Sequence, residues 1–370
     1  MSHSLVSSSM LSALGVGASA ATTVGLSAGI KWVMKDGIGA AGRLFVGGNL
    51  GVSIDEDTKR WRMIAEVFTT LGLFLEIATQ LSPSDFVLLA GGGTVAKAVG
   101  AGIGRPCFRV IQNHFAKVNN IGDVSAKEEV WETTAQLVGI AASVALLRGL
   151  EAVSADDASV VVPVWFAVQG LHVVVRWHAL RVLQFPWPNF KRGNMLASAY
   201  IGSEGGGEAA VPGLVRVNFD ERMGRGTTRL VHGTVCVFGS GWQEAVGTWP
   251  AAAVQEVIRL YRGEQYVLVV DGDGRGGRGR SGGEREIRVV LCVDATGEDM
   301  MKAMLQASWI DEYAHAGGVV DGMELQRESL RYASARFGEF QELAEAAGWR
   351  FAQTQFPLDR DVRLERLEVV

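Results

Sequence analysis

The sequence predicts an α+β fold, in which a mainly α-helical N-terminal bundle precedes a smaller α+β domain. Three observations lead to this prediction. Apolar residues recur at helical spacing through the first half, a glycine-rich break occupies residues 201–213, and valine-rich segments follow the break. We therefore predict a helical domain over residues 1–200, a linker over 201–213 and an α+β domain over 214–370.

The composition narrows the class of protein. Hydrophobic residues make up 48% of the 370 positions and charged residues only 20%, whereas soluble domains carry about 25% charged residues. The net charge of -5 argues against a nucleic-acid partner, since such proteins are normally basic. The three cysteines form no CxxC pair, so neither a metal site nor a disulfide framework is predicted.

The first fifty residues hold two patterns that we interpret as structural. Residues 1–30 are rich in serine and alanine, like a transit peptide, but they contain no arginine and no basic region before an apolar core. We interpret them as part of the folded domain. Gly15, Gly17 and Ala20, with Asp36 further on, match the spacing of a dinucleotide-binding turn. The residues before them do not read as a buried strand, so this function is not favoured.

Four apolar helices are expected in the first half, at residues 62–81, 86–104, 126–148 and 163–183. The "SPSD" sequence ends the first helix and starts the second, because Ser82 can cap a helix and Pro83 suits its first turn. Small residues four apart, at Gly100 and Gly104 and earlier at Gly25 and Gly29, are typical of helices that approach closely.

These helices are borderline membrane spans. A span needs about 20 mostly apolar residues, and the candidates contain Glu66, Glu76 and Lys97. If the first two helices fold back across "SPSD", Glu66 and Lys97 lie at heights that differ by only about 3 Å. A buried ion pair between them would lower the cost of both charges in a low-dielectric bundle. A solvated or core-edge charge on each helix is the alternative, and membrane association stays open beside it.

The second half predicts strands at residues 213–220, 231–238, 264–271 and 286–294, and a last strand at 350–356. The "GDGRGGRGRSGG" segment is interpreted as a flexible hairpin connection rather than an RNA-binding tract. Thr296 and Asp299 form a capping-box pattern, which predicts a helix towards His315. A second helix is expected to stop at Gly348.

The polar sequence "NNIGDVSAKEEVWET" at residues 119–133 interrupts the apolar half. Ser125 is a good N-cap and Glu128 can return a hydrogen bond to it, so a helix start explains much of this stretch. It leaves Asp123 and Lys127 without an explanation. It also does not explain the basic residues that precede the stretch, which are Arg105, Arg109, His114 and Lys117.

Other chemistry-bearing residues gave weaker signals. His172, Arg176 and His178 share one predicted helix, but the two histidines are six apart and lie on different faces, so core or bundle-edge roles are favoured over metal binding. We find no serine in a nucleophile elbow and no cysteine beside a histidine in the sequence, and therefore predict no catalytic residue. An enzyme whose groups converge only in the fold stays open.

Four stretches carry a resemblance to a known family: "WVMKDGIGAAGRLF", "KRWRMIAEVFTTLGLFLEI", "NHFAKVNNIGDVSAKE" and "LHVVVRWHALRVL". They resemble the successive signature blocks of the Root UVB Sensitive family, in its order and at about its spacing. The chain departs from the family in lacking a further upstream helical segment and in having Trp131 where glutamine is usual. The residues carried over by position are candidates for a ligand or partner site: Lys35, Asp36, Arg43, Arg60, Asn120, Asp123, Lys127 and Glu128.

The resemblance implies a non-enzymatic, membrane-associated protein that acts through partners in the UV-B response, vitamin B6 homeostasis or auxin transport. It also implies an intracellular membrane, of a plastid or another organelle, a family paralogue or a second copy as partner, and no cofactor. The alternative is a soluble protein that binds a small anion such as pyridoxal phosphate at the helix start near Lys127. Glu128 and Glu129 beside Lys127 would repel an anion.

Overall fold

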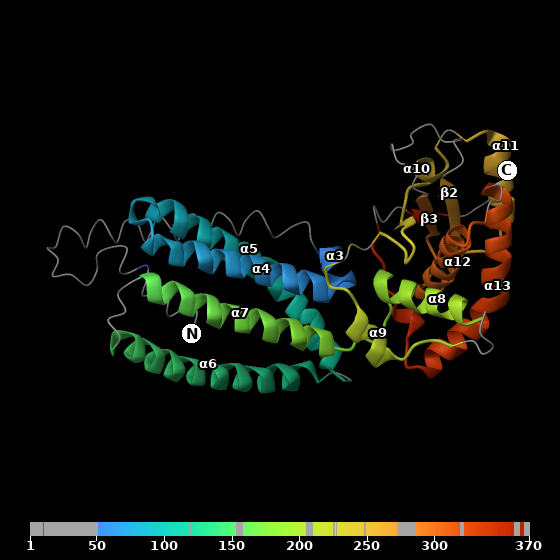
Figure 1. The fold of residues 1–370 in the computed structure, drawn as a ribbon. Coiled ribbons are helices and arrows are strands. Elements are labelled where there is room, and N and C mark those ends of the chain that lie inside the picture. Colours follow the sequence, from blue (N-terminus) through green and yellow to red (C-terminus); the bar gives the residue numbers. More distant parts are fainter. Residues whose placement is uncertain are drawn as a thin grey trace. The chain divides into compact units, whose positions relative to one another are not determined.

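A computed structural model gives the fold, shown in Figure 1. The structure describes residues 10, 51–117, 120–152, 158–204, 210–224, 226, 228–247, 249–271, 286–318, 322–358 and 363–365. Predictions that fall elsewhere, at Gly25, Gly29, Lys35, Asp36, Arg43 and residues 272–283, lie outside these residues. The chain divides into two compact units, Met1–Leu180 (unit 1) and Arg181–Val370 (unit 2). Unit 1 is helical where it is described and unit 2 mixes helices with a sheet, which confirms the predicted fold class.

Unit 1 is built from long helices. Its described elements are α3 (Gly51–Glu56), α4 (Thr58–Ile77), η1 (Ala78–Gln80), η2 (Pro83–Asp85), α5 (Phe86–Phe115), α6 (Ile121–Ala152) and α7 (Ala158–Val182). The predicted positions of the four apolar helices are confirmed, although α5 extends eleven residues further than expected. It continues through Pro106, whose missing N–H removes one backbone hydrogen bond from the helix.

Glycines set the distance between α4 and α5. A Cβ atom built on Gly72 would lie 2.6 Å from the carbonyl oxygen of Gly93, and one on Gly100 would lie 2.8 Å from the carbonyl oxygen of Ala65. Both distances are too short for any side chain, so only glycine permits this approach. Gly104 also faces Ala65. The predicted close packing through Gly100 and Gly104 is therefore confirmed.

The buried ion pair of this hairpin differs from the predicted one. Lys97 Nζ lies 2.6 Å from Oε1 of Glu76, whose side chain is 2% exposed. A Cβ on Gly72 would lie 2.6 Å from Cγ of Lys97, and one on Gly93 would lie 2.8 Å from Cγ of Glu76. Each charged side chain thus crosses a glycine of the opposite helix. The predicted pair between Glu66 and Lys97 is wrong, because this register turns Lys97 towards Glu76.

The start of α6 also differs from its prediction. The helix begins at Ile121, so Ser125 lies inside it and is not the N-cap. Asn120 takes the place of a cap: its backbone carbonyl accepts a hydrogen bond from Val124, and its Oδ1 accepts one from the backbone N–H of Lys117. Since Asn120 already closes the turn, the helix can start five residues before the predicted position. The helix ends at Ala152, four residues beyond the predicted end at residue 148.

Unit 2 combines several short helices with a sheet of four described strands. Its helices are α8 (Phe190–Glu204), α9 (Leu214–Asp220), α10 (Trp242–Val246), α11 (Ala251–Leu260), α12 (Gly297–His315), α13 (Gly322–Ala346) and the 3-10 helix η3 (Phe351–Gln353). The strands are β1 (Val235–Phe238), β2 (Tyr266–Asp271), β3 (Glu286–Cys292) and β4 (Arg363–Leu364). The central strand β3 pairs antiparallel with β2 and parallel with β1 and β4.

Two strand predictions in unit 2 are wrong. Residues 213–220 alternate in polarity but form helix α9, in which Val217 and Asn218 are buried. Residues 350–356 contain η3, and the edge strand β4 follows at Arg363–Leu364. Both segments are short, so packing decides between helix and strand more strongly than their sequence pattern does. The predicted capping box of α12 is confirmed, with Thr296 and Asp299 bonded to each other's backbone.

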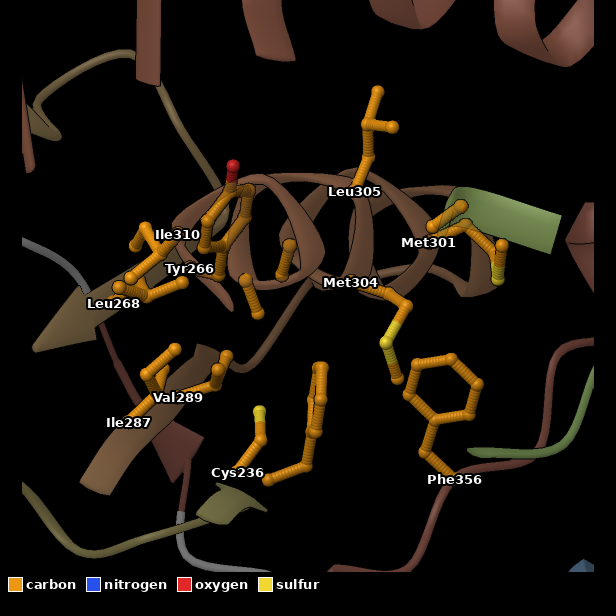
Figure 2. Close-up of a cluster of buried hydrophobic side chains, with 14 of the residues drawn as sticks. Cys236, Tyr266, Leu268, Ile287, Val289, Met301, Met304, Leu305, Ile310 and Phe356 are labelled. Carbon is orange, nitrogen blue, oxygen red and sulfur yellow. The ribbon is translucent and has the colours of Figure 1, made fainter. Parts of the chain in front are cut away.

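The core of unit 2 lies between the sheet and α12. Figure 2 shows Leu268 of β2 and Val289 of β3 directed towards Met304 and Ile310 of the helix. Phe356 closes one end of this cluster and contacts the rings of Phe190 and Phe238. This layer of buried apolar side chains is what holds the sheet and its helices together.

The boundary between the parts was predicted twenty residues too late. Helix α8 belongs to unit 2, because Phe190, Leu196 and Tyr200 are buried in the same cluster as the sheet. A Cβ on Gly193 of α8 would lie 3.1 Å from the sulfur of Met301 in α12. The glycine-rich segment 201–213 therefore connects two helices of one unit and is not a linker between domains.

Candidate functional site

A cavity of about 630 Å³ lies in unit 1, at the end of the helices where α4 and α6 begin and α5 and α7 end. Charged side chains from all four helices line it. We call the residues Arg62, Arg105, Arg109 and Arg176 the arginine wall and the residues Glu128, Glu129 and Glu132 the glutamate wall. The arginine wall comes from α4, α5 and α7, whereas the glutamate wall comes from α6 alone.

Glu66 lies at the base of the arginine wall with its side chain only 5% exposed. Its Oε1 lies 2.8 Å from Nε2 of His172, and its Oε2 lies 3.5 Å from Nη1 of Arg62 and 3.6 Å from Nε of Arg176. A buried carboxylate is costly unless it is paired, and here groups from α4 and α7 surround it. Glu66 therefore joins α4 to α7 and fixes the orientation of two arginines.

The α5 part of the arginine wall has no acidic partner in the described part of the chain. Arg105 and Arg109 are one turn apart and exposed. Among the residues that the structure describes, neither guanidinium forms an ion pair or a side-chain hydrogen bond. Two arginines spaced in this way present several N–H donors to the same region, which suits a carboxylate or phosphate oxygen.

The glutamate wall faces the same cavity with the opposite charge. Glu128 accepts a hydrogen bond of 2.7 Å from Gln112 of α5, and Glu132 accepts one of 3.2 Å from Gln136. No ion pair between the described residues crosses the cavity to the arginine wall. The cavity thus separates two groups of opposite charge that do not neutralise each other.

The predicted site residues are mostly elsewhere. Asp123 and Lys127 form an exposed ion pair of 2.8 Å on α6, outside the cavity lining. Arg60 donates its backbone N–H to Asp57 at the start of α4, and Asn120 closes the turn before α6. Of the five predicted residues that the structure describes, Glu128 alone lines the cavity. A ligand or partner role for the other seven stays a prediction.

Sequence reasoning missed the centre of the cavity, although a signal for it was present. Arg62 and Glu66, and likewise His172 and Arg176, are four residues apart in apolar helices. That spacing places each pair on one helix face. Charged pairs on a common face of an otherwise apolar helix indicate an interior polar site. Both pairs also belong to the stretches that resemble the family.

The described residues contain no group of three or more His, Cys, Asp or Glu side chains that could hold a metal ion. What the cavity offers chemically is charge. It has guanidinium donors on one side, carboxylate acceptors on the other, and enough volume for a small molecule.

The part of the chain that contains the cavity matches a known protein family. Residues 1–204 match the family described as "Vitamin B6 photo-protection and homoeostasis domain". The chain is 34% identical to root UVB sensitive 5 of Arabidopsis thaliana, over 98% of this chain and 69% of that protein. It is 26% identical to root UVB sensitive 2, chloroplastic, of the same plant, over 86% of this chain and 68% of the relative.

A more distant relative covers less of the chain. RUS family member 1 of Dictyostelium discoideum is 30% identical over 54% of this chain and 38% of its own length. No solved structure matches the chain.

Proposed function

The chain belongs to the root UVB sensitive family, and from this premise we propose that it is an integral membrane protein that binds a small charged ligand in the cavity of unit 1 and serves vitamin B6 homeostasis. The observation that carries the proposal is the cavity itself. It gathers charged side chains from four predominantly apolar helices.

The outer faces of α6 and α7 support the membrane part of the proposal. Four helices are long and apolar enough to span a bilayer, namely Thr58–Gln80, Pro83–Phe115, Ile121–Gly149 and Val160–Val182. Val138 of α6 is 65% exposed, and Leu171 and Val175 of α7 are also exposed. Contiguous apolar surface of this kind is unfavourable in water, whereas lipid would cover it without cost.

The buried charges of unit 1 also support integration in a membrane. Glu66 and Glu76 are buried and paired, as ionisable groups inside membrane proteins normally are. Residues 133–147 of α6 carry no charge and span about 22 Å at about 1.5 Å per residue. A hydrocarbon core is about 30 Å thick, so the glutamate wall at the start of α6 would lie near a membrane surface. A ligand could then enter from water.

We propose binding rather than catalysis as the activity. Glu66 and His172, the groups best suited to proton transfer, engage each other at 2.8 Å, and Glu128 is held by Gln112. We further propose that a second copy or a family paralogue contributes at the exposed faces of α6 and α7. Auxin transport stays a prediction from the family resemblance.

A second candidate function is binding of a small anion by a soluble protein, and the unneutralised Arg105 and Arg109 favour it. Pyridoxal phosphate is the probe for this candidate. Lys127 lies outside the cavity and pairs with Asp123. Binding of pyridoxal phosphate in the cavity therefore does not require an imine between its aldehyde and Lys127. Titration of the purified chain with pyridoxal phosphate should then saturate in Lys127→Ala as in the unchanged protein. A flat titration in both would remove this candidate.

The membrane proposal is tested by fractionation. The full chain is expressed in a eukaryotic host, and its membranes are washed with carbonate at high pH. We expect the chain to stay in the pellet, as an integral membrane protein does, and to leave it only with detergent. Recovery in the carbonate supernatant would overturn the proposal. A fluorescent fusion examined in the same cells tests the plastid or other organelle that the family resemblance implies.

A further inference from the structure

We propose that the cavity of unit 1 takes a small zwitterion, with its anionic group against the arginine wall and its protonated amine against the glutamate wall. This inference deepens the proposed function and rests on it, because it takes the cavity as the ligand site. It adds the chemical class of the ligand and the orientation of its two charged groups between the arginine wall and the glutamate wall.

The separation of charge across the cavity carries the inference. On the α4, α5 and α7 side, four arginines are accompanied by Glu66 as the acid, so this side has excess positive charge. On the α6 side, three glutamates are accompanied by Ser125 and by no basic residue of the lining. A ligand whose two ends carry opposite charges would satisfy both sides at once.

A ligand with one charge fits less well. An anion alone would pair with Arg105 and Arg109 but would remove water from the glutamate wall without offering it a donor. A cation alone would pair with the glutamate wall but would remove water from the arginine wall without offering it an acceptor. Leaving a polar group desolvated without a partner costs more free energy than a formed hydrogen bond contributes. Each single-charge ligand therefore leaves one wall desolvated and unpaired, whereas the zwitterion pairs with both.

The helix geometry fits the two ends of such a ligand. Arg105 and Arg109 lie one turn apart on α5 and present planar guanidinium groups, which bind phosphate or carboxylate oxygens in pairs. Glu128, Glu129 and Glu132 lie within two turns of α6 and offer acceptor oxygens for the three donors of an ammonium group. The cavity volume of about 630 Å³ suits a small molecule.

A phosphate joined to an amine by a short chain has two sources in a cell: a soluble metabolite and the headgroup of an aminophospholipid. The experiment therefore uses the full chain in detergent and in lipid nanodiscs. The soluble probes are phosphoethanolamine, which carries both charges, ethyl phosphate, which carries the anion, and ethanolamine, which carries the cation. Binding is measured by calorimetry.

We expect phosphoethanolamine to bind at least about tenfold more tightly than either single-charge probe, because each charged contact is strong. Arg105→Gln with Arg109→Gln should abolish the binding of both phosphates. Glu129→Gln with Glu132→Gln should lower the affinity for phosphoethanolamine to that for ethyl phosphate. These four side chains are exposed, so the variants should fold. Arg148→Gln, exposed on α6 and outside the cavity lining, is the matched control.

The two sources are separated by the nanodisc lipid. Loss of phosphoethanolamine binding in phosphatidylethanolamine discs, with binding retained in phosphatidylcholine discs, would identify the lipid headgroup as the occupant. Equal binding in both would identify a soluble ligand. Equal affinity for ethyl phosphate and phosphoethanolamine would overturn the zwitterion while leaving an anion site. Failure of all three probes in a chain that resists carbonate extraction would overturn the inference and leave membrane integration standing.

Discussion

In unit 2 the valines and leucines of β2 and β3 are buried, whereas in unit 1 many of those of α6 and α7 are exposed. Leu268 and Val289 of the sheet are fully buried within their own unit, while Leu137 is 64% exposed and Val175 is 59% exposed. Both units bury charged pairs, with Glu66 and Glu76 in unit 1 and Arg192 with Glu221 in unit 2, whereas the cluster around the sheet of unit 2 is apolar.

This difference indicates which environment, water or lipid, suits the surface of each unit. A domain in water gains stability from burying its apolar surface. Unit 2 does this within its own residues. Unit 1 leaves that surface available and places its charges in pairs and around a cavity, which is the arrangement that lipid favours.

Leu268→Ala should destabilise unit 2 by about 2–5 kcal/mol, because it leaves a cavity in a fully packed core. Leu137→Ala on the exposed face of α6 is the matched change and should alter the unfolding free energy in detergent by less than about 0.5 kcal/mol. Urea unfolding of the full chain measures both. Equal losses at the two positions would show that α6 is buried against protein and would end the contrast between the units.

Ile140→Arg should reduce membrane integration, because Ile140 is 60% exposed at the middle of the uncharged stretch of α6 and an arginine at the centre of a span costs about 2.5–3.5 kcal/mol on insertion scales. The measurement is the fraction of chain that resists carbonate extraction, with Ile140→Met as control. In a soluble bundle the same substitution would add a charge to an exposed position and change little. An unchanged carbonate-resistant fraction would show that this face of α6 does not lie at the centre of a bilayer.

Glu76→Ala should destabilise the α4–α5 hairpin by about 2 kcal/mol, less than the about 3–5 kcal/mol typical of a fully buried pair. We expect this smaller loss because the side chain of Lys97 is 26% exposed, so water can solvate the lysine that Glu76→Ala leaves unpaired. Replacing both Glu76 and Lys97 by leucine should recover most of the loss, since no charge is then left unpaired. Asp123→Ala, in an exposed ion pair, is the control and should cost about 0.5 kcal/mol or less. A double variant no more stable than the single one would contradict this account.

The smallest effect is on pH dependence in unit 2. Burial raises the pKa of the Cys236 thiol above its ordinary value, so the folded chain keeps a proton that the unfolded chain releases above about pH 8.5. The stability of unit 2 should therefore fall by about 1 kcal/mol between pH 7 and pH 9 through this group. Unfolding under reducing conditions, compared with Cys236→Ala, isolates the effect. An identical decline in the variant would assign it to other groups.

Much of the fold could be predicted because its signals are local. The apolar helices, the strands at Tyr266–Asp271 and Glu286–Cys292 and the capping box at Thr296 each depend on residues near one another in the chain. The failures were at α9 and at residues 350–356, where short segments take their conformation from packing. The start of α6 was misplaced because two residues, Asn120 and Ser125, both suit a helix start.

Less of the candidate site could be predicted. Glu128 was among the predicted residues, but Arg62, Glu66, His172 and Arg176 had to be brought together by the fold. Asp123 and Lys127 drew attention because they are polar in an apolar half, yet they satisfy each other on the surface of α6. A polar residue in the sequence indicates a site only when its neighbours in space leave it something to bind.

The signature stretches of the sequence indicated the family, and its periodicity and composition indicated the helical first half and its apolar character. Only the folded chain shows that Lys97 meets Glu76 rather than Glu66, that α8 packs with the sheet, and that four helices line an open cavity of opposed charges. The physical reason is the register between helices. Close contacts at Gly72 and Gly93 set it, and a contact between residues far apart in sequence leaves no periodic signal.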